Sequence, residues 1–221
     1  MRIDERIQQA GTTYEQAVFA GDTGGLDGAE RGLDAMEADI ALARGRLLHA
    51  RFLSARADRA TPVEDPAELA LFERAATTYR ELGDVRGEGE ALFWMGCLHQ
   101  VVRRDDDVAV PLLERSLQLA TRADDKATQA EALRHLGIAA HGAGRLDEAR
   151  ERLEESSRRW RAAGVLPGVA ANMIGLAVIA TAQGRPADPI LDEALVIARS
   201  AGAHAVVRQI EEVRAGIQAG A

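Results

Sequence analysis

Cysteine is almost absent from the chain, since Cys97 is the only one among 221 residues. A single thiol can form neither an internal disulfide nor a cysteine-based zinc cluster. Long apolar runs are missing as well, and no stretch approaches the roughly 20 apolar residues of a membrane-spanning helix. The N-terminal segment MRIDERIQQAG is charged and lacks the apolar centre of a secretory signal. We therefore expect a soluble, cytoplasmic protein that has no association with membranes.

Lysine, proline and aromatic residues are also scarce. Lys126 is the only lysine beside 26 arginines, an imbalance that we attribute to a GC-rich genome rather than to function. Six prolines occur, and aromatic residues make up 4 % of the chain. The abundant residues are Ala, Leu, Glu and Arg, without alternating runs of Val, Ile and Thr, and this composition favours an all-helical protein. The net charge of −8 argues against a nucleic-acid partner, because such binding needs clustered positive charge.

A helical unit recurs along the second half of the chain. Residues 131–163 predict two helices and a tight turn, because apolar residues recur at spacings of three and four on either side of a glycine-containing break. A large apolar residue followed by glycine recurs at Met95–Gly96, Leu136–Gly137 and Ile174–Gly175. The anchors of the second helices, Leu112, Leu153 and Leu191, show the same spacings of 41 and 38 residues. One such hairpin cannot bury its own apolar faces, so the repeat predicts a stack of hairpins.

These units resemble tetratricopeptide repeats over roughly residues 86–201. The positions that carry the resemblance are Leu92, Met95, Gly96 and Leu98; Leu133, Leu136, Gly137, Ala140, Ala149, Leu153 and Ser156; and Ala171, Ile174, Gly175, Val178, Ala187, Leu191 and Ala194. The unit is longer than the usual 34 residues of the family. Aliphatic residues also replace most of the family's aromatic ones. In both respects the chain is similar to the looser variants of bacterial regulatory proteins.

We expect an all-α fold, an α-α superhelix (solenoid) of about five antiparallel hairpins with a C-terminal capping helix, in a single domain 1–221. The expected parts are a degenerate hairpin at 1–37, repeat hairpins at 38–83, 86–123, 127–163 and 168–201, and a half-polar capping helix at 203–219. The first helix is expected at 3–20. Eleven helices result, although no stop signal after Met36 separates the second from the third. In the helix 38–57, one side carries Ile40, Ala43, Leu47, Ala50 and Ser54, with Leu48 and Phe52 beside them.

No motif indicates catalysis, a metal or a cofactor. The glycine-rich stretch 21–28 lacks a preceding strand and a following Gly-Lys-Ser/Thr, so it favours a permissive loop over a phosphate site. The acidic run 105–107 favours a helix cap over a calcium loop. The five histidines are scattered, and a His–carboxylate pair could arise only through a tertiary contact. Trp160, within Arg158–Arg161, is expected to pack between hairpins, with an anionic-partner contact of the arginines as the alternative.

The resemblance implies a concave groove lined by the first helices, in which the family commonly binds an extended peptide or a short helix. The implied contact residues are Glu90, Phe93, Cys97, Gln100, Glu131, Arg134, His141, Asn172, Leu176 and Ile179. Ile138 and Val169 occupy equivalent positions. Arg134 and Asn172 are expected to hold backbone or carboxylate groups, and Phe93 to anchor an apolar side chain.

Three functions remain open. The first is a non-enzymatic scaffold or adaptor that binds a protein or peptide in this groove. The second is a ligand- or peptide-sensing regulatory module of a bacterial transcription or signalling system, acting through a partner or as part of a longer protein. The third and least favoured is a small enzyme with a pocket in the groove. Self-association is a further possibility, because an incompletely capped end hairpin leaves apolar surface exposed, and the first hairpin is the favoured surface.

Overall fold

The computed structural model describes residues 4–57 and 61–220, which contain ten α-helices and no strand. Ile3, the first residue of the expected helix 3–20, lies outside this part of the chain. The helices are α1 Glu5–Glu15, α2 Leu26–Ala57, α3 Ala67–Leu82, α4 Val85–Leu98, α5 Asp106–Arg122, α6 Lys126–Gly142, α7 Leu146–Ala162, α8 Leu166–Ala182, α9 Asp188–Ser200 and α10 His204–Gly220. Two π-helical turns, η1 Gln16–Ala20 and η2 His99–Arg103, follow α1 and α4. Among the described residues, no helix is long and apolar enough to cross a membrane.

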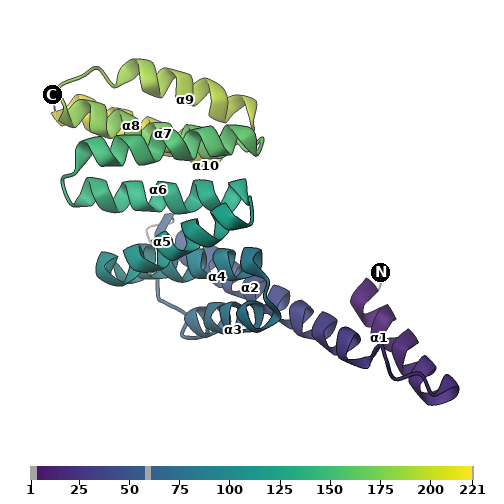
Figure 1. Ribbon diagram of the computed structural model, residues 1–221. Coiled ribbons are helices and arrows are strands. Elements are labelled where there is room, and N and C mark those ends of the chain that lie inside the picture. Colours follow the sequence, from purple (N-terminus) through teal and green to yellow (C-terminus); the bar gives the residue numbers. More distant parts are fainter. Residues whose placement is uncertain (1–3, 58–60, 221) are drawn as a thin grey trace.

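The helices stack as antiparallel hairpins in chain order, so the predicted all-α solenoid is confirmed (Figure 1). The hairpins α4–α5, α6–α7 and α8–α9 follow one another, and α10 covers α8 and α9 at the C-terminal end. The first helices α2, α4, α6 and α8 contact each other in succession, whereas the second helices α3, α5, α7 and α9 do so at most weakly. Because the second helices fan apart, we place the first helices on the inner face of the array.

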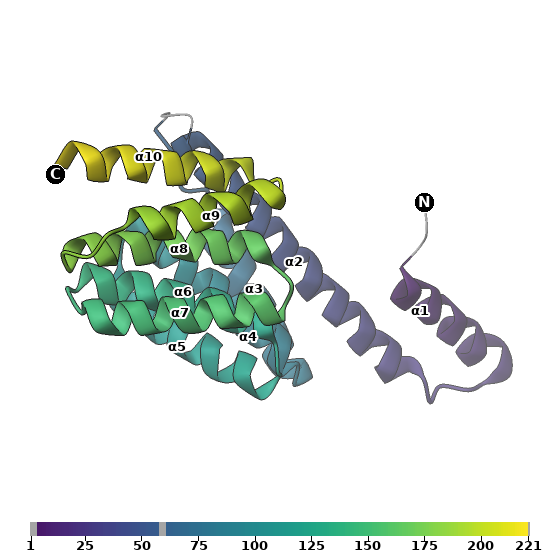
Figure 2. The same cartoon turned by 90° about the horizontal axis from the view of Figure 1, so that it is seen from above.

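The second helix is a single element of 32 residues that runs through residue 37, where the sequence suggested a boundary between two hairpins. The expected count of eleven helices was therefore wrong by one, for the reason that no proline or capping signal interrupts the chain here. The N-terminal part of α2 extends beyond the stacked hairpins and carries α1 beside it (Figure 2). We call residues 5–37 the arm.

The stripe that the sequence showed on one side of α2 is not the buried face of this helix. Ile40, Ala43, Leu47, Ala50 and Ser54 are exposed. The buried residues are instead Ala38, Ala41, Leu42, Gly45, His49 and Phe52. Gly45 explains the choice, since a Cβ built there would lie 2.4 Å from Cε1 of Phe72 on α3. Only a residue without a side chain lets the Phe72 ring approach α2 this closely, and this tertiary fit outweighs the alternative apolar stripe.

The recurring glycines serve the same purpose within the hairpins and between them. A Cβ at Gly96 would lie 2.8 Å from Cγ of Leu113, and one at Gly175 would lie 2.8 Å from Cδ1 of Leu153. A Cβ at Gly137 would meet Leu153 at 3.1 Å. The apolar-Gly step therefore marks the point where the first helix of a hairpin receives a leucine from a second helix.

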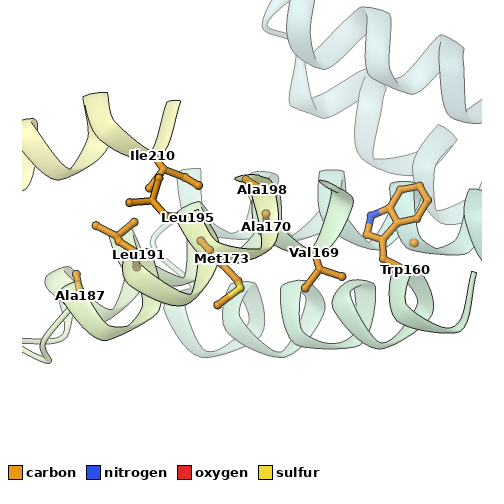
Figure 3. Packing of buried hydrophobic residues seen from close by; sticks show 12 residues of the cluster. Trp160, Val169, Ala170, Met173, Ala187, Leu191, Leu195, Ala198 and Ile210 are labelled. Atoms are coloured by element: carbon orange, nitrogen blue, oxygen red, sulfur yellow. The ribbon is translucent and has the colours of Figure 1, made fainter. Parts of the chain in front are cut away.

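Trp160 packs at the junction of the last two hairpins, as predicted (Figure 3). It belongs to a buried cluster with Val169 and Met173 of α8, Leu191 of α9 and Ile210 of α10. Its neighbours Arg158 and Arg159 form ion pairs with Glu155, and the first of these contacts lowers the pKa of that carboxyl group. Asp105 caps α5 by accepting from the backbone N–H of Val108, which confirms the helix-cap interpretation of the acidic run.

Candidate functional site: the inner face of the array

A chain of buried polar side chains links α2, α3, α4 and α6 beneath the inner face. The sulfur of Cys97 lies 3.6 Å from Nε2 of His49 and 3.8 Å from Nε2 of His135. Nδ1 of His49 lies 2.8 Å from Oε1 of Glu68, which is completely buried. Nδ1 of His135 lies 2.6 Å from Oε1 of Gln100. The single cysteine therefore sits between two imidazoles, each of which is oriented by a second polar group.

The protonation states of His135 and Cys97 follow from their burial. The amide oxygen of Gln100 can only accept, so Nδ1 of His135 donates and Nε2 presents its lone pair to Cys97. Burial lowers the pKa of His135 to about 3, and this histidine is neutral at pH 7. Burial also raises the pKa of the Cys97 thiol, which remains protonated and can donate toward His135.

The order Cys97, His49, Glu68 is that of a nucleophile, a base and an orienting carboxylate. All three side chains are buried, however, and a neutral thiol beneath the surface is a poor nucleophile. Among the described residues, no group of three or more His, Cys, Asp or Glu side chains is placed to hold one metal ion. The arrangement can therefore hold four helices in register, and that is the role the geometry supports.

Sequence reasoning missed both His49 and Glu68 as partners. Glu68 lies in the first turn of α3, where a carboxylate usually faces solvent near the positive end of the helix dipole. No motif joins two residues whose helices are separated by an irregular loop. The sequence predicted that a His–carboxylate pair could arise only through a tertiary contact. Such a contact joins His49 to Glu68, whereas the partner of Nδ1 of His135 is the amide oxygen of Gln100.

Closer to the surface, Arg134 of α6 is held by Asn172 of α8. Nη1 of Arg134 donates to Oδ1 of Asn172 at 3.1 Å. The amide nitrogen of Asn172 donates to the hydroxyls of Ser156 at 2.8 Å and Ser157 at 3.2 Å on α7. Asn172 is fully buried, so it positions the guanidinium of Arg134 and leaves contact with solvent to the arginine, which is half-buried.

Charged residues continue along the inner face toward α2. Nη1 of Arg46 forms a 3.1 Å ion pair with Oε1 of Glu90, and its guanidinium lies 5.3 Å from the centre of the Trp94 ring. Glu131 of α6 is half-buried, and burial raises the pKa of its carboxyl group while Arg134 and Arg46 oppose the shift. For Arg134 the direction is the opposite: burial lowers the pKa of its guanidinium group, and the Glu131 carboxylate opposes that shift. The row of charges thus runs from α2 to α6, with the carboxylates of Glu90 and Glu131 between the guanidinium groups of Arg46 and Arg134.

The ten residues expected in the groove divide into two groups. Half-buried side chains that reach the surface are Glu90, Gln100, Glu131, Arg134, His141 and Leu176. Phe93, Cys97, Asn172 and Ile179 are buried. Phe93 packs among α4, α5 and α6 residues, and its ring lies 5.4 Å from that of His135. Ile179 packs against Ala140, Ala149 and Leu153. These four buried side chains therefore pack beneath the surface of the inner face and are not part of it.

Leu176 and Gln100 also face surroundings that the family pattern did not indicate. Leu176 lines a groove of about 330 Å³ between α7 and α9, together with charged residues that include Arg161, Arg185 and Glu193. The amide nitrogen of Gln100 donates to Asp106 at 2.9 Å and to the carbonyl of His135 at 3.1 Å. On α6, Glu131, Arg134 and the exposed Ile138 are side chains that reach the surface.

The comparisons with known proteins agree with this architecture. The family described as tetratricopeptide repeat matches residues 90–162 and 128–188, which span α4 to the start of α9. No curated protein matches the chain. Tetratricopeptide repeats generally mediate protein–protein interaction. Together with the apolar-Gly steps and the consecutive helical hairpins, this match over residues 90–188 supports a tetratricopeptide-repeat-like family.

Proposed function

We propose that the chain is a non-enzymatic scaffold that holds a peptide segment of a partner protein along its inner face. The observation that carries the proposal is the fixed position of Arg134. Asn172 accepts its hydrogen bond, and two serine hydroxyls fix Asn172 in turn. A cation that is already ordered loses little conformational entropy when it binds, so it can grip a carboxylate or a backbone carbonyl at low cost.

The remaining charges of the row suit an extended ligand. Glu131 lies one turn from Arg134 on α6, and Glu90 lies on the neighbouring first helix, paired with Arg46. A peptide that crosses α4 and α6 would present backbone N–H groups or a basic side chain to Glu131 and a carbonyl or carboxylate to Arg134. Exposed Ile138 supplies an apolar contact between Arg134 and His141. We infer contacts through these residues, with Phe93 and Ile179 supporting them from the core.

The experiment uses photocrosslinking to identify the face that binds. A photoreactive residue replaces Ile138 on the inner face or, in a control, the exposed Val196 on the outer helix α9. We expect a protein from a native lysate to crosslink from position 138 and not from position 196. The substitution Arg134→Gln should remove this crosslink, whereas Arg115→Gln on the outer helix α5 should leave it intact. Crosslinking from position 196 alone would place the binding surface on the outside.

A further inference from the structure

The arm, residues 5–37, is ordered without a core of its own. Thr13 is its only buried residue. Ile7, Tyr14 and Val18 are exposed at helical spacing along α1 and η1, and Phe19 at the tip is 82 % exposed. A run of apolar side chains along one helical face indicates a surface that another element covers, and no described part of the chain covers it.

The arm nevertheless has a fixed direction. Nη1 of Arg6 on α1 forms a 2.6 Å ion pair with Oδ2 of Asp39 on α2. The hydroxyl of Tyr79 on α3 donates to the other oxygen of Asp39 at 2.8 Å. Nη2 of Arg31 donates to the carbonyl of Leu82 at 3.3 Å. These contacts join α1, α2 and α3, so the arm is held out from the stacked hairpins in a defined position (Figures 1 and 2).

Gly11 lies in the middle of the exposed stripe and shows what kind of element fits there. In the stacked hairpins, glycines such as Gly45, Gly87 and Gly168 are each covered by an aromatic ring of a packed helix, within 2.6 Å of a Cβ built there. At Gly11 a built Cβ meets nothing within 4 Å. An uncovered glycine inside a helix costs about 1 kcal/mol relative to alanine. Gly28 and Gly216 are uncovered in the same way, so Gly11 is distinguished by its place in the exposed apolar stripe, where it leaves room for a closely packed helix.

The net negative charge of the arm favours a partner with a basic surface. Residues 5–37 contain seven acidic and two basic residues, so the arm carries most of the net negative charge of the chain. Asp27, Glu30, Asp34 and Glu37 are exposed on α2 at helical spacing. Carboxylates at such spacings repel each other, and a second arm brought alongside would add to that repulsion. A helix that carries Lys or Arg beside an apolar stripe would offset it.

We propose that the arm docks a basic amphipathic helix of another protein, with the stripe Ile7, Gly11, Tyr14 and Val18 receiving its apolar face. The acidic residues of α2 attract its basic side chains. This surface is separate from the inner face of α4, α6 and α8. Binding at the arm can therefore be present or absent irrespective of binding at Arg134.

The test uses a synthetic helix of about five turns, built from leucine and lysine so that the leucines form one stripe. A peptide of the same composition in scrambled order controls for charge alone. Calorimetric titration should show binding of the amphipathic peptide that weakens as salt is raised, and clearly weaker binding of the scrambled one. Equal binding of both peptides would overturn the proposal.

A pair of matched variants locates the contact. Gly11→Leu adds a side chain in open space on the arm, and Gly216→Leu does the same in α10, where a built Cβ also meets nothing within 4 Å. Both variants should fold, as circular dichroism can verify, because leucine favours a helix more than glycine does. Gly11→Leu should weaken peptide binding roughly tenfold, because overpacking separates the two helices, while Gly216→Leu should leave it unchanged.

Two further results would contradict the proposal. Equal peptide affinity of the two leucine variants would mean that the stripe is not the contact surface. Self-association of the wild-type protein in sedimentation equilibrium, if Gly11→Leu abolished it and the peptide did not compete, would show that a second copy covers the arm. The photocrosslink from position 138 provides an independent measure of inner-face binding and is expected to be the same in the wild type and in Gly11→Leu.

Discussion

The hydroxyl of Ser156 donates a 2.6 Å hydrogen bond to the backbone carbonyl of Ala130, joining the two helices of one hairpin. In the preceding hairpin Ser116 makes the same contact with the carbonyl of Gly89 at 2.7 Å. Both serines are fully buried. Ser156 has an additional task, since its oxygen accepts from Asn172.

The two serines should therefore differ in their contribution to stability. Ser116→Ala removes one interhelical hydrogen bond and should cost about 1 kcal/mol of unfolding free energy. Ser156→Ala should cost more, by about 1 kcal/mol, because the buried amide of Asn172 then loses a partner as well. Urea denaturation of both variants gives the comparison. Equal losses would mean that Asn172 finds another acceptor.

Alanine should be destabilising at Gly96, although it normally stabilises a helix. The new methyl group would lie 2.8 Å from Cγ of Leu113, so the α4–α5 contact must widen, at a cost of about 1–3 kcal/mol. Gly216→Ala is the matched control in open space and should gain up to about 1 kcal/mol. Opposite signs in thermal unfolding are the expected result, and stabilisation by both substitutions would contradict the close approach.

The Cys97 thiol should react slowly with iodoacetamide in the native protein. It is buried between His49 and His135, and burial raises its pKa, so thiolate is scarce and access is poor. Mass spectrometry of the alkylated protein should show rapid modification only after denaturant is added. Fast labelling of the folded protein at pH 7 would indicate an activated thiol and would revive the enzymatic alternative.

His135 should make stability depend on pH below neutrality. Its folded pKa is lowered to about 3, whereas an unfolded histidine titrates near 6.5. Between about pH 6.5 and pH 3, His135 is protonated in the unfolded chain but not in the folded one. The free energy of unfolding therefore falls as the pH falls through this range. In His135→Gln the slope of unfolding free energy against pH should be less steep by about one proton. An unchanged slope would place a charged histidine in the core.

Amide hydrogens of the arm should exchange faster than those of α4 to α9. Only Thr13 is buried between residues 5 and 37, so local opening exposes little apolar surface and costs little free energy. Hydrogen exchange followed by mass spectrometry gives the comparison peptide by peptide. Protection of the arm equal to that of α6 would mean that it is covered in solution.

The repeating part of the fold was predictable because its signals are local. The steps Leu136–Gly137 and Ile174–Gly175 combine helical period with a small residue at the crossing point, and both properties belong to a few neighbouring residues. The face of α2 was not predictable in this way. It presents two apolar stripes, and the choice between them depends on Phe72 covering Gly45, a contact between separate helices.

The candidate site shows the same division. Arg134 and Asn172 were both expected to line the groove, and a hydrogen bond joins them. Asn172 is buried whereas Arg134 reaches the surface, and this difference depends on Ser156 and Ser157 of α7, which hold Asn172 in the core. Phe93 and Cys97 are buried because the aromatic and histidine side chains around them close over this part of α4. The pairing of His49 with Glu68 left no local trace in the sequence.

The continuity of α2 has a geometric consequence. A helix of 32 residues is about 48 Å long, and no break separates the end that carries α1 from the end that carries Arg46 and His49. Near the middle of this helix, Asp39 contacts Arg6 of α1 and Tyr79 of α3. These two contacts fix the direction of the arm relative to the first stacked helices. The arm and the segment that carries Arg46 and His49 therefore share one helix axis.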